Sequence, residues 1–204
     1  MSFSEFKDIP QVQRKYGIKY KESNFIEVSE FAVPESFRKD FAFNLENFDA
    51  FSSEGARCEI IIFPILREVY RPYSSILALW VQKPVSFDDE LTGTPDYIVS
   101  KRSEYGKLFL ESPILSVVEA KKNDFEQGWG QCLAELVASQ KLNNSEAPVY
   151  GIVTDGETWK IGLLENKVFT RNIKNFTIDD LSELFSSLNF VFKKMVAGIT
   201  TKPV

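Results

Sequence analysis

The sequence of 204 residues predicts an α/β domain in which helices flank a mixed central β-sheet. Helical and strand-like patterns follow one another in the order helix, three strands, helix, strand, hairpin, helix. The composition, 44% hydrophobic and 26% charged, is that of an ordinary globular domain. Two short acidic motifs stand in or beside apolar, strand-like segments. We therefore expect a single domain over residues 1–204, with its core at about 52–164.

The chain begins with a stretch that has no clear period. Residues 1–33 are polar and aromatic, so we expect an irregular N-terminal extension with a short strand at 25–28. Pro34 then suits the first turn of a helix. The apolar residues of that helix recur at helical spacing at Phe37, Phe41, Leu45 and Phe48.

A second helix is predicted to begin near Ser52 or Ser53, because serine is a good N-cap. Glu54 would lie in its first turn, where an acid suits the helix dipole. The helix should run towards Tyr70, and Pro64 should kink it or break it into two shorter helices.

The rest of the chain alternates strands with two long helices. The predicted strands are 76–81, 91–99, 114–121, 149–154 and 158–164, and the predicted helices are 125–141 and about 177–198. Gly128 and Gly130 are poor helix formers, which favours a later start for the first of these helices. The strands on either side of that helix are expected to lie parallel in the sheet.

The composition excludes several kinds of chemistry. There is no histidine, which excludes Ser-His and Cys-His hydrolases and histidine-ligated zinc. Two cysteines are too few for a disulfide framework or a zinc cage. No apolar run is long enough to span a membrane, and the N-terminus lacks the pattern of a secretory signal. We therefore expect a cytoplasmic protein without a membrane partner.

The most informative motifs are Pro95-Asp96 and Glu119-Ala120-Lys121, whose acids are 23 residues apart. The second motif ends an apolar strand, in which alternate residues share a face, so Glu119 and Lys121 should point the same way. Two carboxylates and an ammonium group at strand ends can hold a hard divalent cation against a phosphate. The pair of motifs therefore predicts phosphodiester hydrolysis.

These motifs resemble a known family. The segments 93–96 (Gly-Thr-Pro-Asp) and 118–121 (Val-Glu-Ala-Lys) are similar to the signature of the PD-(D/E)xK nuclease superfamily, which has the restriction-endonuclease-like fold. Ser53-Glu54 with Pro64 ten residues beyond the glutamate resembles the opening helix of nuclease domains in type I restriction motor subunits. The segment 128–135 resembles the helix that follows the signature in a branch with glutamine there. The resemblance covers about 54–164.

The resemblance implies a role for each matching residue. Asp96 and Glu119 would bind Mg²⁺ (or Mn²⁺), helped by the backbone carbonyl of Ala120. Lys121 would orient or activate the attacking water and stabilise charge on the phosphate. Gln131 would orient the lysine, the water or the DNA backbone. The function implied is Mg²⁺-dependent hydrolysis of DNA, either by a monomer or by a homodimer whose two sites reach both strands.

Glu54 would contact the metal directly or through water, and it has a rival in the same helix. Glu59 lies five residues further on, about 140° around a regular helix, so both acids cannot point at one metal without distortion. We prefer Glu54 because of its match to the position of Pro64.

A different class of function stays open. The net charge of −5 is unfavourable for a nucleic-acid partner, because neutralisation of phosphates supplies much of the affinity. A local basic strip could offset this charge, and its candidates are Lys101, Arg102, Lys107, Lys121 and Lys122. The alternatives are a catalytically silent module of the same fold that binds nucleic acid or protein, and a structural protein whose acids form buried ion pairs. Convergence of Asp96, Glu119 and Lys121 around an open cleft would favour the enzyme.

Overall fold

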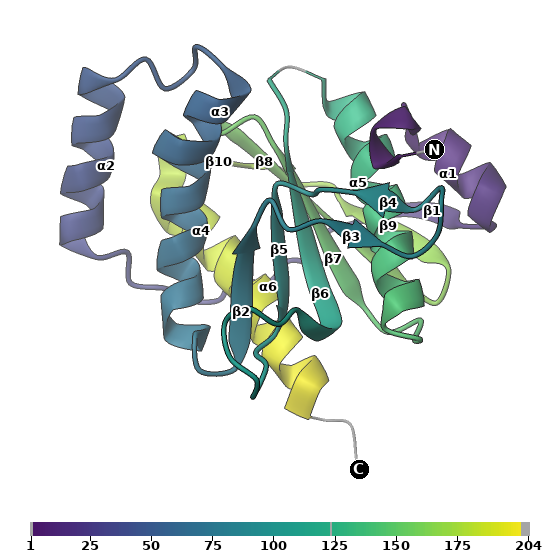
Figure 1. Cartoon of the computed structure of the whole chain (residues 1–204). Coiled ribbons are helices and arrows are strands. Elements are labelled where there is room, and N and C mark those ends of the chain that lie inside the picture. Colours follow the sequence, from purple (N-terminus) through teal and green to yellow (C-terminus); the bar gives the residue numbers. More distant parts are fainter. Residues whose placement is uncertain (1, 123, 201–204) are drawn as a thin grey trace.

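A mixed β-sheet crosses the middle of the molecule and carries helices on both faces (Figure 1). The computed structural model describes residues 2–122 and 124–200, so Met1 and 201–204 of the expected domain lie outside the described residues. The strands are β1 (Lys19–Ser23), β2 (Leu77–Val81), β3 (Val85–Ser86), β4 (Thr92–Gly93), β5 (Tyr97–Lys101), β6 (Glu111–Ala120), β7 (Val149–Thr154), β8 (Thr158–Glu165), β9 (Val168–Asn172) and β10 (Phe176–Thr177). Within this part of the chain the main sheet has eight strands in the order β1-β9-β8-β7-β6-β5-β2, with β10 paired to β8.

The helices are α1 (Ile9–Tyr16), α2 (Glu35–Asn47), α3 (Glu54–Arg57), α4 (Phe63–Tyr70), α5 (Phe125–Leu142) and α6 (Leu181–Thr200). Short helical turns are η1 (Phe3–Glu5), η2 (Cys58–Ile62, a π-helical turn), η3 (Arg71–Tyr73) and η4 (Ile178–Asp180). Helices α5 and α1 cover one face of the sheet, and α2, α4 and α6 cover the other (Figure 1). The expected α/β class, with a mixed sheet between helices, is thereby confirmed.

Alternate strand residues fill the two cores. Val117 and Val153 pack under α5, whereas Val118 and Ile152 belong to the core under α4 and α6. This is the period of two that an apolar strand buried on both faces requires. The buried core extends beyond the expected range of 52–164, since Phe3 and Phe185 are almost completely inaccessible.

Three neighbouring strands determine where the acidic motifs lie. Strand β5 is antiparallel to β6, with Tyr97 opposite Val118. Strand β6 is parallel to β7, and the chain passes between them through α5, so the expected parallel arrangement is confirmed. The start of β5 and the end of β6 therefore meet at one edge of the sheet.

The irregular extension expected over residues 1–33 is wrong for its first part. Asp8 caps α1 by accepting a hydrogen bond of 2.8 Å from the Gln11 N–H, and Gly17 ends the helix with a φ of 68°. Strand β1 then pairs in parallel with β9 at the edge of the sheet. Its residues lack an apolar alternation because they are almost all exposed, which is why no strand was expected there.

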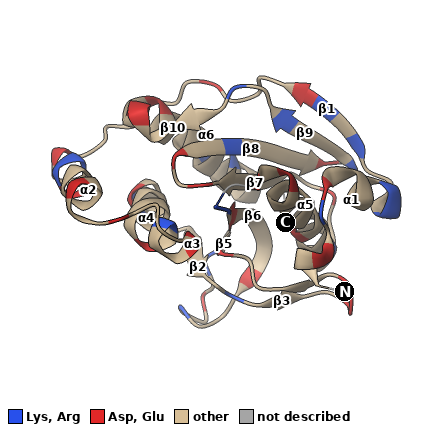
Figure 2. Ribbon diagram, turned by 90° about the horizontal axis from the view of Figure 1, so that it is seen from above, with Lys and Arg blue, Asp and Glu red and all other residues tan. Residues whose placement is uncertain are grey.

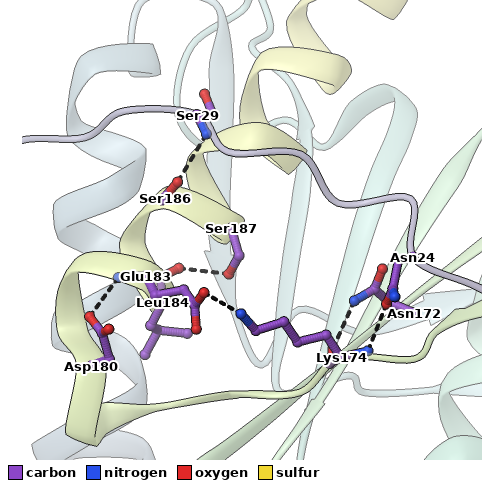
Figure 3. Close-up of polar contacts among 9 residues, drawn as sticks. All are labelled: Asn24, Ser29, Asn172, Lys174, Asp180, Glu183, Leu184, Ser186 and Ser187. Atoms are coloured by element: carbon purple, nitrogen blue, oxygen red, sulfur yellow. Dashed lines mark hydrogen bonds and ion pairs between the residues drawn. The ribbon is translucent and has the colours of Figure 1, made fainter.

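The strand expected at 25–28 is also wrong, because these residues pair with no strand, and the N–H groups of Phe25 and Ile26 donate instead to the Asn172 side-chain oxygen of β9. Side chains anchor this segment at both ends (Figure 3). The Asn24 side-chain oxygen accepts a 3.0 Å hydrogen bond from the Lys174 N–H, and the Ser29 N–H donates to the Ser186 hydroxyl at 2.9 Å. The ammonium group of Lys174 in turn pairs with Glu183 of α6.

The second helix begins as expected, with Ser53 accepting a 3.0 Å hydrogen bond from the Ala56 N–H. Pro64 does not break it. The π-helical turn η2 stands immediately before the proline, and the residues at both junctions keep helical dihedral angles. A π turn removes the hydrogen bond that proline cannot donate, so the helix continues through it.

Helix α5 begins at Phe125. The later start that Gly128 and Gly130 suggested is therefore wrong. Asp124 caps it by accepting a 2.9 Å hydrogen bond from the Gln127 N–H. The glycines serve packing: a Cβ atom at Gly130 would lie 2.5 Å from the Asp8 nitrogen. Tertiary contact therefore outweighs their poor helix propensity.

The C-terminal helix, expected at about 177–198, is found as η4 followed by α6, which runs to Thr200. Asp180 accepts a 2.9 Å hydrogen bond from the Glu183 N–H at its first turn. Among the helices of residues 2–122 and 124–200, none has the length and apolar character needed to cross a bilayer.

Candidate active site

The two acidic motifs meet at one edge of the sheet. The Ala120 N–H at the end of β6 donates a 2.8 Å hydrogen bond to the Asp96 Oδ2 atom, directly before β5. Because Tyr97 pairs with Val118, Asp96 stands opposite Glu119. Strand pairing thus brings together two motifs that are 23 residues apart in the sequence.

Glu119 and Lys121 point to the same face, as the strand period predicts. Their side chains form an ion pair, with 3.1 Å between the Lys121 Nζ and Glu119 Oε2 atoms. Glu119 is completely buried, whereas the Lys121 side chain keeps 16% of its surface exposed. Lys122 turns away and donates to the Ser52 carbonyl at 3.1 Å. Lys121 is therefore the lysine that belongs to the site.

A residue that the motifs did not indicate completes the cluster. Glu135 of α5 is fully buried, and its Oε1 atom accepts a 3.2 Å hydrogen bond from the Gln131 side-chain amide. Its Oε2 atom and the Glu119 Oε1 atom are both buried without an N–H or hydroxyl partner among the described residues. The two carboxyl groups influence one another's pKa, and they can form a hydrogen bond only by sharing a proton. An acid four residues after Gln131, in a helix that is otherwise apolar there, is the sequence signal that could have found it.

Burial and like charge control these carboxyl groups. Burial, helped by the negative charge of Asp96, raises the pKa of Glu119 to about 7, although Glu135 and Lys121 oppose the shift. Burial and the neighbouring Glu119 raise the pKa of Glu135 well above its usual value. Burial also raises the pKa of Asp96, although the Ala120 N–H and Lys121 oppose the shift. All three carboxyl groups therefore lose their protons less readily than exposed ones.

For Lys121, the neighbouring charges outweigh the effect of burial on the pKa. Burial alone would lower its pKa, but the charges of Glu119, Glu54 and Asp96 together raise the pKa above its usual value. The side chain is therefore a permanent positive charge. It lies next to carboxyl groups that have lost most of their contact with water, where its field acts with little screening.

The rival helix acids both line one cavity. A cavity of about 300 Å³ lies between α3, η2 and the start of β5, with Glu54, Glu59 and Asp96 in its wall. The expectation that a regular helix separates the two acids does not hold here, because Glu59 lies in the π-helical turn. Glu54 is the acid that influences the pKa values of Asp96 and Lys121, so it is the closer of the two in electrostatic terms.

The donor atoms suit a hard cation in kind. Asp96, Glu119 and Glu54 supply carboxylate oxygens, which Mg²⁺ prefers. The Glu119 Oε1 atom is buried and has no N–H or hydroxyl partner among the described residues. In the same part of the chain, however, no three acids or cysteines are arranged as a ready cation site. A cation would thus have to draw Glu54 or Glu59 towards Asp96 and Glu119.

The expected basic strip is not assembled. Strand β5 runs away from Asp96, so Lys101 lies at its far end, paired with Glu111. Arg102 donates to the Ser74 carbonyl beyond that end, and Lys107 follows in the same loop. Only Lys121 and Lys122 of the five candidates lie near the acids. Lys101 is close to Asp96 in the sequence but not in space, because the five residues of β5 that end at Lys101 span about 17 Å.

Comparison with known proteins adds no family. No protein family model matches this chain, and no curated protein matches it.

Proposed function

We propose that this chain is a Mg²⁺-dependent phosphodiesterase that acts on DNA, with a restriction-endonuclease-like fold of the PD-(D/E)xK type. One observation carries the proposal: Asp96 is hydrogen-bonded to the strand that bears Glu119, and Glu119 is paired with Lys121. The antiparallel β5–β6 pair and the parallel β6–β7 pair support it, because they bring both halves of the signature to one edge of the sheet.

Asp96 and Glu119 would hold the metal, with the Ala120 carbonyl between them. When bound, Mg²⁺ supplies a Lewis acid that neutralises charge on the phosphate and lowers the pKa of water. Lys121 provides a fixed positive charge, which binds the scissile phosphate, orients the attacking water and stabilises the extra negative charge of the transition state. Gln131 and Glu135 position the Glu119 carboxyl group from behind.

Substitution of the two motif residues tests this proposal. Asp96→Ala and Lys121→Ala should each reduce Mg²⁺-dependent nicking of plasmid DNA by at least about 100-fold, the usual cost of losing one charge-stabilising group. Both proteins should keep the wild-type circular dichroism spectrum. Lys122→Ala is the matched control, because this side chain only reaches the Ser52 carbonyl, and it should cleave normally.

Calorimetry separates metal binding from catalysis. Wild-type protein should bind Mg²⁺ or Mn²⁺, and Asp96→Ala should not. Absence of heat at millimolar ion, together with nicking that survives both substitutions, would refute the proposal.

The second candidate is a catalytically silent module of the same fold that binds nucleic acid or protein. The complete burial of Glu119 and its raised pKa favour this candidate, because a metal ligand needs access and loss of its proton. For this candidate we expect DNA binding by the wild-type protein without cleavage at any Mg²⁺ or Mn²⁺ concentration.

A further inference from the structure

Glu119 belongs to a row of directly paired residues that runs across neighbouring strands of the sheet to Lys160. Glu119 pairs with Val153 of β7, and Val153 pairs with Lys160 of β8. Side chains of directly paired residues share a face, so Lys160 lies on the α5 face at the same level as Glu119. Two strand spacings separate them, which is about 10 Å. This is the axial length of about three nucleotides of duplex DNA.

Lys160 lies in a pocket of about 320 Å³ between α1 and α5. Its Nζ atom lies 3.8 Å from the centre of the Phe125 ring, at the first residue of α5. Arg171 of β9 lines the same pocket. Figure 2 shows blue segments, which mark Lys and Arg, on the neighbouring strands β8 and β9.

The charge of this pocket is not fully balanced. Among the described residues Lys160 forms no ion pair, whereas Arg171 is held by Glu22 at 2.8 Å. Burial and the repulsion of Arg171 lower the pKa of Lys160, and the attraction of Asp155 is too weak to restore it. Glu126, at the rim, is exposed. A bound anion would relieve the repulsion between Lys160 and Arg171.

We propose that Lys160 and Arg171 form a phosphate-binding subsite for a DNA strand that leaves the acidic site past the first turn of α5, which covers β7 there, with Phe125 as a stacking surface beside it. This inference rests on the proposed function and deepens it by giving the strand a direction. Lysine and arginine recognise phosphates, and an aromatic ring next to them accepts an unpaired base. The pocket replaces the basic strip that the sequence suggested at Lys101 and Lys107.

The test measures DNA binding without cleavage. Fluorescence anisotropy of labelled duplex and single-stranded oligonucleotides should be followed at several salt concentrations, first with EDTA and then with Ca²⁺. Lys160→Gln should weaken binding by about five- to tenfold near 0.1 M salt. It should also reduce the slope of log K against log salt by about 0.9 for a duplex or 0.7 for a single strand. Arg171→Gln should act in the same direction.

Three further variants make the result specific. Lys160→Arg should retain affinity, and Phe125→Leu should weaken only the single strand, since it removes stacking but no charge. Lys101→Gln, at the far end of β5, should leave affinity and slope unchanged.

Each outcome decides one proposal. Wild-type affinity and slope in folded Lys160→Gln and Arg171→Gln proteins, or no DNA binding by the wild-type protein, would overturn the subsite. If Lys160→Gln weakens binding but the wild-type protein never cleaves, the subsite stands and the proposed hydrolase fails.

Discussion

Glu119 illustrates what a single residue contributes to this protein. A carboxyl group without any exposed surface loses its hydration, which strongly disfavours its charged form. The structure offers it one ammonium group, from Lys121, and a second carboxyl group, from Glu135. Glu119 is therefore poised between a neutral form that stabilises the fold and a charged form that a cation would require.

The raised pKa values of the two buried glutamates predict that Glu135→Gln changes the stability of the protein in a pH-dependent way. The pKa of Glu119 is 4.5 in an exposed chain and about 7 in the folded protein. Folding is thus favoured by proton binding below about pH 4.5, and this stability is lost as the pH rises through about 7. Glu135 follows the same rule, because burial and Glu119 raise its own pKa well above the usual value. Glu135→Gln removes this carboxyl group, so it should stabilise the protein by about 1–3 kcal/mol at pH 8 and change little near pH 4.5.

Urea denaturation at several pH values measures this difference. Glu126→Gln is the control, because this acid lies exposed on the same helix, and its effect on stability should be small. A Glu135→Gln protein that is less stable than the wild type at pH 8 would contradict the explanation.

Among the elements, α5 does most to shape the site. It carries Gln131 and Glu135 against Glu119, and its first turn passes very close to the end of β6. A Cβ atom at Gly128 would lie 2.7 Å from the Val153 Cγ1 atom and 2.9 Å from the Lys121 Cγ atom. The glycine therefore allows the helix to approach the strand and holds the lysine stem in place.

Gly128→Ala should displace Lys121 or push α5 away from the sheet. The expected cost is about 1–3 kcal/mol of unfolding free energy, as for other overpacked positions, together with reduced nicking. Chemical denaturation and the plasmid assay measure the two effects. Gly198→Ala in α6 has open space around it and should instead stabilise by about 0.5–1 kcal/mol. Equal behaviour of the two variants would show that the close approach does not matter.

On the scale of the whole molecule, the N-terminal segment is bound to α5 and to the far edge of the sheet. Gly130 is the contact point, since a Cβ atom there would lie 2.5 Å from the Asp8 nitrogen and 2.8 Å from the Phe6 oxygen. Backbone atoms cannot move aside as a side chain can. The segment also supplies Phe3 and Phe6 to the core under α5.

Gly130→Ala should therefore loosen η1 and α1 from the sheet. Limited proteolysis should cleave the variant within about the first 20 residues at protease concentrations that leave the wild type intact, because local opening exposes the chain. Gly198→Ala, again the control, should resist as the wild type does. Unchanged proteolysis of Gly130→Ala would mean that the docking tolerates the extra methyl group.

Much of the fold follows from local pattern. Helix α2, the start at Ser53, strand β6 and the parallel β6–β7 pair were all predicted, because apolar period and capping residues act over a few positions. The N-terminal elements were missed for a physical reason. Strand β1 is stabilised by its backbone pairing with β9 and by little burial of its own side chains, so its sequence carries no strand period.

By itself the sequence determined that Glu119 and Lys121 share a face, because alternate residues of a strand point the same way. The antiparallel pairing of β5 with β6, which places Asp96 opposite Glu119, belongs to the tertiary structure. Only the tertiary structure decided what surrounds these residues. It placed Glu135 behind Glu119, took Lys101 and Lys107 to the opposite end of β5, and brought Lys160 level with the acids. Such contacts join residues from separate elements through packing, and packing leaves no periodic trace in the chain.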